Sequence, residues 1–163
     1  MKILVVSDSH GAVDVLEKVI ESHIHGVRHV FHLGDGCGDI GILAHRYPDV
    51  SFHVVSGNCD EFSSNETSYP DKLIVSVGGK KILATHGHKY HVKMSYDRIC
   101  YAALEAGVDI CLFGHTHNQT SFEYERIYFL NPGAIYKSNE ELECAIIDLS
   151  NELISVKLIA VNK

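Results

Sequence analysis

The feature that most constrains the fold is a pattern that occurs five times: a short, mainly apolar run that ends abruptly in polar residues. The first run, residues 3–6, has no polar alternation, which is typical of a strand buried on both faces of a sheet. The later runs have the same form. The polar ends are Asp8-Ser9-His10, Gly34-Asp35, Gly57-Asn58-Cys59-Asp60, His86-Gly87-His88 and Gly114-His115-Thr116-His117.

These polar ends are expected to meet in space, although the sequence scatters them. In open α/β sheets the ligand crevice lies outside the carboxyl ends of the strands. Asp8 and His10 are two residues apart, a spacing that puts both side chains on one side of an extended chain. A carboxylate and an imidazole so placed can begin a metal site. We therefore predict one site built from all five loops.

The first sixty residues predict strands that alternate with helices, and hence a parallel sheet. Apolar residues recur at helical spacing over residues 13–24. A second helix is predicted after Asp35, with Pro48 as its stop. Residues 61–72 are polar and lack periodicity, so they predict a loop that overhangs the site.

The remainder of the chain predicts a hairpin, one helix and several short strands. Gly78-Gly79 separates two apolar runs and supplies the positive φ angles that a two-residue turn needs. A helix is predicted over residues 94–106, with Ser95 as a candidate cap and Gly107 just past its end. We expect the last strand candidates to form a second, antiparallel sheet. These candidates are residues 121–124, 127–130, 144–149 and 153–159.

Length and charge bound the class of protein. At 163 residues and 45% hydrophobic, the chain can bury one core, so a single domain over residues 1–163 is expected. Its 14 Lys and Arg against 21 Asp and Glu give a net charge of −7, and no basic cluster exceeds Lys80-Lys81. Long nucleic acids are therefore not expected as partners. A homo-oligomer is compatible with the sequence.

Apolar runs and cysteine usage suggest a location. No run approaches the ~18 apolar residues of a membrane span, and the apolar run at the start is too brief for a signal peptide. We therefore expect no membrane partner. The five cysteines are odd in number and include no Cys-x-x-Cys pair, which argues against a disulfide framework. Free thiols fit a reducing compartment, and a cytoplasmic location is expected.

The candidate metal ligands are carboxylates, one amide and imidazoles. They are Asp8, His10, Asp35, Asn58, His86, His115 and His117. This many oxygen and nitrogen donors exceeds the needs of one tetrahedral ion and suits two ions that share a bridge. We expect two divalent ions, manganese first, with iron, zinc or nickel as alternatives. Such a pair lowers the pKa of a bridging water and stabilises both the entering and leaving oxygens of phosphoester hydrolysis.

In this order along the chain, the five motifs resemble the calcineurin-like metallophosphoesterase superfamily, specifically its small bacterial and archaeal phosphodiesterase branch. Asn131-Pro132-Gly133 is similar to a later family signature. The resemblance implies an α/β fold, a four-layer α/β/β/α sandwich of two mixed sheets flanked by helices. It also implies that Asp35 bridges the two ions. The first ion would be held by Asp8, His10, Asp35 and His117, and the second by Asp35, Asn58, His86 and His115.

Cys59 departs from the family pattern. Many relatives have a histidine directly after the motif asparagine, and it is taken to protonate the leaving group; here a thiol with a reference pKa near ~8.5 stands instead. The branch that this chain resembles often has cysteine here and is associated with phosphodiesters. Asn58, Cys59 and His88 are the candidate catalytic residues, with His88 as a replacement proton donor or substrate contact. Alternatively, Cys59 is a small buried filler.

Each motif also has a simpler structural interpretation. Asp8 and Asp35 could be helix caps, and Asn58 and Asp60 could shape a turn. All five motifs would then have to coincide by chance, so we favour the metal site. His32 and Asp39 are expected to support it from behind.

The sequence therefore predicts a metal-dependent phosphodiesterase that acts on small phosphodiesters by a two-metal mechanism with a bridging hydroxide as nucleophile. A non-catalytic scaffold of the same fold, similar to the retromer subunit, is the first alternative. A phosphomonoesterase is the second. A nuclease would need a basic groove, which the sequence does not provide.

Overall fold

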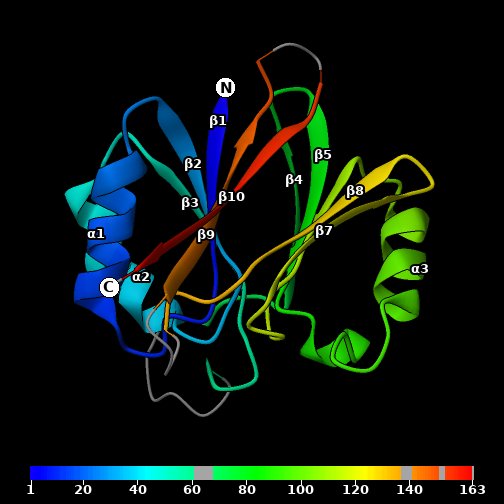
Figure 1. Ribbon diagram of the computed structural model, residues 1–163, viewed down its shortest axis with the longest axis horizontal. Coiled ribbons are helices and arrows are strands. Elements are labelled where there is room, and N and C mark those ends of the chain that lie inside the picture. Colours follow the sequence, from blue (N-terminus) through cyan, green and yellow to red (C-terminus); the bar gives the residue numbers. More distant parts are fainter. Residues whose placement is uncertain (61–67, 137–140, 151–152, 163) are drawn as a thin grey trace.

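Two five-stranded sheets pack face to face, and helices cover the outer side of each (Figure 1). The computed structural model describes residues 1–60, 68–136, 141–150 and 153–162. The strand order is β10-β9-β1-β2-β3 in the first sheet and β4-β5-β6-β8-β7 in the second. The predicted four-layer sandwich of two mixed sheets is confirmed.

The first sheet begins with alternating strands and helices, as predicted. These elements are β1 (Lys2–Val6), α1 (Val13–His23), β2 (Val27–His32), α2 (Cys37–Leu43), the 3-10 helix η1 (Ala44–Arg46) and β3 (Ser51–Val54). The pairs β1–β2 and β2–β3 are parallel, which confirms the predicted topology. Their carboxyl ends therefore lie at one edge of the sheet.

The second sheet contains the predicted hairpin, and the helix predicted over residues 94–106 covers it but begins three residues later, at Asp97. Its elements are β4 (Lys72–Val77), β5 (Lys80–Thr85), the 3-10 helix η3 (His88–Tyr90), α3 (Asp97–Ala106), β6 (Ile110–Leu112), β7 (Gln119–Tyr124) and β8 (Ile127–Pro132). Gly78 and Gly79 both have positive φ, as the turn requires. Helix α3 begins at Asp97, whose N–H bonds to the Ser95 hydroxyl, and ends at Gly107.

The prediction that the last four strands form one antiparallel sheet is wrong. Strands β7 and β8 extend the second sheet, whereas β9 (Glu141–Asp148) and β10 (Ser155–Asn162) join the first. The local pattern identifies strands but not their partners. Strand β2 pairs with one edge of β1, and β9 pairs with the other edge in antiparallel register, with Ile3 opposite Ile147.

Three apolar clusters explain the unbroken hydrophobic runs. In β1, Ile3 and Val5 face the core between the two sheets, while Leu4 and Val6 face the core beneath α1 and α2. A third cluster lies beneath α3, around Phe113. Of the predicted loop over residues 61–72, residues 61–67 lie outside the described residues, and Lys72 already begins β4.

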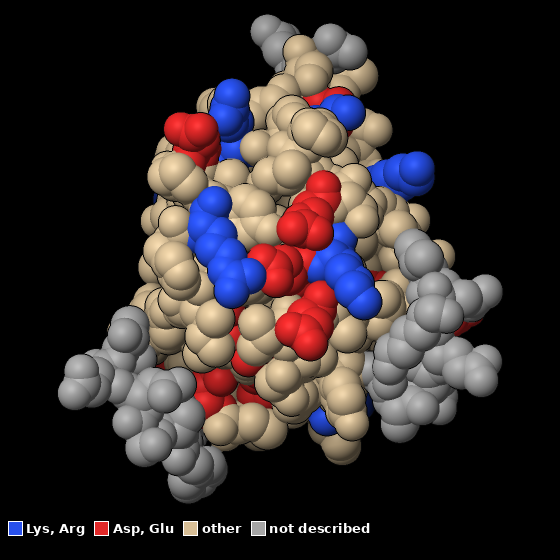
Figure 2. All heavy atoms as spheres, turned by 90° about the vertical axis from the view of Figure 1, so that its left-hand side faces the viewer, with Lys and Arg blue, Asp and Glu red and all other residues tan. Residues whose placement is uncertain are grey.

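The helices of the first sheet are amphipathic. Leu16, Val19 and Ile20 of α1 are buried, whereas the outward side is charged. Figure 2 shows acidic and basic side chains interleaved on this side. Arg46 of η1 pairs with Glu17 of α1 at 2.5 Å. Exposed pairs of this kind contribute little stability. Among the described residues, no helix is long and apolar enough to cross a membrane.

Candidate metal centre

The seven predicted ligands all follow the carboxyl ends of strands, and the two sheets provide different ones. The loops after β1, β2 and β3 of the first sheet provide Asp8, His10, Asp35 and Asn58. The loops after β5 and β6 of the second sheet provide His86, His115 and His117. The structure brings them together where the two edges face each other.

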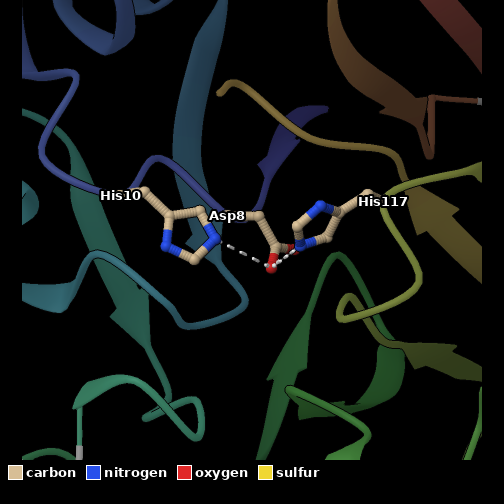
Figure 3. A group of neighbouring side chains, drawn as sticks. All are labelled: Asp8, His10 and His117. Atoms are coloured by element: carbon tan, nitrogen blue, oxygen red, sulfur yellow. Dashed lines mark ion pairs between the residues drawn. The ribbon is translucent and has the colours of Figure 1, made fainter. Parts of the chain in front are cut away.

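The first group is centred on Asp8, which is fully buried (Figure 3). His117 Nε2 lies 3.0 Å and His10 Nε2 lies 3.8 Å from Asp8 Oδ1. Within the described part of the chain, this oxygen accepts no hydrogen bond of good geometry. Burial opposes ionisation of Asp8, but the neighbouring His117 lowers its pKa, and Asp8 raises the pKa of His117. A buried carboxylate oxygen faced by two imidazoles fits a cation ligand.

Asp35 lies between the first group and the second. Its Oδ2 atom is 3.9 Å from His10 Nε2 on one side and 3.5 Å from His86 Nε2 on the other. The side chain is only 3% exposed, so its charge is poorly solvated. This position is the one that a shared ligand would need.

The second group converges on His86. Its Nδ1 lies 2.7 Å from the Leu33 carbonyl, which can only accept, so Nδ1 carries the proton in the neutral ring. Nε2 then presents a lone pair, yet it faces Asn58 Oδ1 at 3.2 Å and His115 Nδ1 at 3.1 Å. One amide oxygen and two imidazole rings thus converge within hydrogen-bond distance, and this donor set fits a cation between them.

His115 is held in the form that a metal binds. Burial is the main cause and His86 and Lys93 add to it, lowering the pKa of His115 to about 4. The ring is therefore neutral near pH 7, and only a neutral imidazole can bind a metal. Its backbone N–H bonds to Asp8 Oδ2 at 3.2 Å, which links the two groups.

The backbone is strained where the candidate ligands lie. Eight described non-glycine residues have positive φ. Five of them are candidate ligands: Asp8, His10, Asp35, His115 and His117. Such conformations cost of order 1–3 kcal/mol each and concentrate at functional sites. The chain thus holds these side chains in directions that ordinary turns would not give.

The two residues expected to support the site do so through Ser9. The Ser9 hydroxyl donates to Asp39 Oδ2 at 2.6 Å and lies 2.9 Å from His32 Nε2. Asp39 Oδ2 also accepts the Gly11 N–H at 3.0 Å. These buried contacts fix the backbone on both sides of His10.

The candidate catalytic residues lie beside the two groups. Cys59 is exposed, so the buried-filler interpretation is wrong. Its thiol lies near His10 and Asp35, within a group whose ligating atoms are all within 4.8 Å of one another. Burial and the nearby Asp35 raise the pKa of Cys59 to about 11, so the thiol is protonated at neutral pH. The His88 ring lies 5.3 Å from that of His86.

The helix-cap interpretations are also wrong. Helix α1 has Ala12 at its N-cap and α2 has Gly36, and neither Asp8 nor Asp35 caps them.

Sequence reasoning missed Asn131, which appeared only within a family signature. Its buried amide donates to the Gly114 carbonyl at 2.8 Å and to Thr116 Oγ1 at 3.0 Å. A polar residue in an apolar strand was the available signal.

Comparisons with known proteins agree with this geometry. Residues 1–152 match the model of the calcineurin-like phosphoesterase superfamily domain. The chain is 33% identical over 160 residues to a probable metallophosphoesterase, YsnB, of Bacillus subtilis (strain 168), covering 96% of this chain and 89% of that protein.

Solved structures are similar over the whole chain. A conserved protein from Streptococcus pneumoniae TIGR4, described as a predicted phosphoesterase, has a TM-score of 0.80 and 31% identity, covering 97% of this chain and 88% of that one. A novel archaeal phosphodiesterase gives 0.71 and 24%, covering 99% and 100%. Vps29 of Entamoeba histolytica, complexed with zinc, gives 0.74 and 22%, covering 99% of each chain. The last two show likeness of fold alone.

Proposed function

Because this chain belongs to the calcineurin-like phosphoesterase superfamily, we propose that it is a metal-dependent phosphodiesterase that hydrolyses small phosphodiesters. One observation carries the proposal: Asp35 lies between His10 and His86, within 4 Å of a ring nitrogen of each. That arrangement suits a shared ligand of two cations.

The proposed ligand sets follow the two groups. Asp8, His10 and His117 would hold a first ion, Asn58, His86 and His115 a second, and Asp35 both. These oxygen and nitrogen donors favour manganese, with iron, zinc or nickel as alternatives. When bound, two such ions would supply positive charge for the phosphoryl oxygens and lower the pKa of a bridging water.

The chain itself would contribute orientation and a proton. The Cys59 backbone N–H holds Asp35 Oδ1 at 2.8 Å, while its protonated thiol faces the same site. A thiol is a weaker acid than the imidazolium that many relatives have at this position, so it is a poorer proton donor to leaving groups that need one. His88 is the other candidate donor. We therefore expect the rate to depend strongly on the leaving group.

A scaffold without activity is the competing proposal, and the likeness in fold to Vps29 favours it. A phosphomonoesterase is the second competitor. All seven candidate ligands are present, which supports catalysis over a purely structural role. Turnover measurements separate the three functions.

The decisive assay compares a diester with a monoester. With Mn²⁺, the protein should hydrolyse bis-p-nitrophenyl phosphate faster than p-nitrophenyl phosphate, and His117→Ala should abolish this activity. Asp109→Asn is a matched control, because Asp109 accepts the Lys81 N–H at the opposite ends of the strands. A faster monoester would indicate a phosphomonoesterase. If no substrate is turned over with manganese, iron, zinc or nickel, the scaffold function is the one that remains.

Substrate and location complete the proposal. A net charge of −7 with interleaved surface charges suits a small substrate better than a long nucleic acid (Figure 2). All five cysteines are free thiols, which supports a cytoplasmic location.

A further inference from the structure

Asp60 is a partly buried carboxylate beside the centre that is not among the candidate ligands. We infer that it positions the second-ion half of the centre by fixing the loops that present Asp35 and Asn58. The inference rests on the proposed binuclear site. Asp60 is thus a positioning residue, since it acts through the backbone of other residues.

The Asp60 carboxylate gathers backbone donors from two loops. The four N–H groups are those of Asp35 (2.7 Å) and Gly57 (2.7 Å) to Oδ2, and of Gly36 (2.9 Å) and Cys37 (3.0 Å) to Oδ1. The Cys37 thiol adds a further contact at 3.1 Å. One side chain therefore ties the loop after β2 to the loop after β3.

The backbone around Asp35 needs such an anion. Asp35 and Gly36 both have positive φ, at 54° and 141°, and the N–H groups of residues 35–37 point at one carboxylate. Converging backbone N–H groups of this kind bind anions. Without Asp60, these partly buried donors would lose their partner, and the strained turn would relax.

The two loops also touch directly. A Cβ atom added at Gly57 would lie 2.1 Å from Asp35 Oδ1, and one at Gly34 would lie 2.6 Å from the Gly57 nitrogen. A shift of either loop therefore moves the Asp35 carboxylate relative to Asn58. Asp35 is a candidate ligand of both ions and Asn58 of the second alone, so the second ion has two ligands on these loops and the first has one.

Asp39, which is buried, provides the matched comparison. The hydrogen bonds of Asp39 reach Ser9 and Gly11, which flank His10, a candidate ligand of the first ion. Asp39 and Asp60 thus hold opposite halves of the centre. Replacing each by asparagine keeps its shape but removes the charge and turns one acceptor into a donor.

The test is Mn²⁺ titration of the metal-stripped full-length protein, read by calorimetry and by the electron paramagnetic resonance of free Mn²⁺. Asp60→Asn should bind the second ion about 10–100-fold more weakly, and its affinity for the first ion should fall by a smaller factor, because only one ligand of the first ion lies on these loops. Asp39→Asn should weaken the first ion instead. Asp109→Asn should bind both as the wild type does.

Two results would overturn the inference. In the first, Asp60→Asn binds both ions with wild-type affinity; in the second, its affinities for the two ions fall by the same factor. Should Asp60→Asn fail to fold by circular dichroism, Asp60→Glu, which keeps the charge but misplaces it, must show the same split. A wild type that binds no ion would refute the proposed function as well. A wild type that binds two ions beside an unaffected Asp60→Asn would refute only the role of Asp60.

Discussion

The two sheets contribute different chemistry to the same site. Loops of the first sheet provide both aspartates and the asparagine, with one histidine. Loops of the second provide only imidazoles. The loops of the first sheet therefore hold two carboxylates in a buried place. The loops of the second sheet contribute ligands that carry no negative charge.

The supports of the two halves differ in the same way. Behind the first sheet's ligands, the carboxylates of Asp39 and Asp60 accept backbone N–H groups. Behind the second sheet's ligands, the neutral amide of Asn131 holds the loop, and the Gly114 N–H bonds to the His86 carbonyl at 3.0 Å. The comparison teaches that removing a charge from a supporting residue should affect the first half more than the second.

The largest effect is expected at the residue that both groups share. Asp35→Ala removes a carboxylate oxygen that lies within 4 Å of both His10 and His86, so both ions should be lost. Activity on a diester should fall by at least about 10²–10³-fold. His115→Ala should remove the second ion alone. Equal manganese content in the two variants, measured by elemental analysis, would contradict the proposed bridge.

The next effect is a pH dependence of stability in the first half. Burial lowers the pKa of His32 to about 4 in the folded protein, against 6.5 for the unfolded chain. Folding is thus favoured by neutral His32, and this stability is complete above pH 6.5 and is lost as the pH falls toward 4. The loss should be about 3 kcal/mol.

Urea unfolding at pH 7 and pH 4.5 checks this. His32→Gln, which does not titrate, should show a smaller loss of unfolding free energy between these values than the wild type. An identical loss in both proteins would mean that His32 is not the titrating group.

A smaller effect is expected where the loops of the first half touch. A Cβ in Gly57→Ala would meet Asp35 Oδ1 at 2.1 Å, and such overpacking costs about 1–3 kcal/mol. It should also displace Asp35 and lower activity. Gly41→Ala is the control, because its nearest neighbour would be the Tyr69 hydroxyl at 3.6 Å. Thermal unfolding of both, with metal removed, separates packing from metal binding.

The smallest dependence on pH is expected for the support of the second half. Asn131→Ala removes the amide that bonds to Gly114 and Thr116, and it should lower stability by about 1–3 kcal/mol. The loss should not change between pH 7 and pH 4.5, because the amide does not titrate. Asn118 is exposed and lies in the loop that contains Gly114 and Thr116, so Asn118→Ala should change the unfolding free energy very little. If the stability loss of Asn131→Ala changed markedly between these pH values, the proposed difference between the supports of the two halves would be contradicted.

Much of this organisation was predictable, since the candidate ligands directly follow apolar strands. The local sequence identifies pairs of candidate ligands directly after a strand, such as Asp8 and His10 after β1 or His115 and His117 after β6. Parallel strands bring these ends together. The pairing of β9 with β1 was not predictable, because strand patterning carries no information on long-range partners. The role of Asp60 was equally hidden, because the backbone N–H groups that donate to its carboxylate belong to residues 23 to 25 positions away in the sequence.

The most direct test of the account is a crystal structure of the protein soaked in Mn²⁺, with anomalous scattering measured at the manganese edge. The account predicts two peaks where the sheet edges meet, with the Asp35 carboxylate between them. The oxygens of the first sheet and the imidazoles of the second should surround them. A site without anomalous density, or peaks only elsewhere on the molecule, would contradict it.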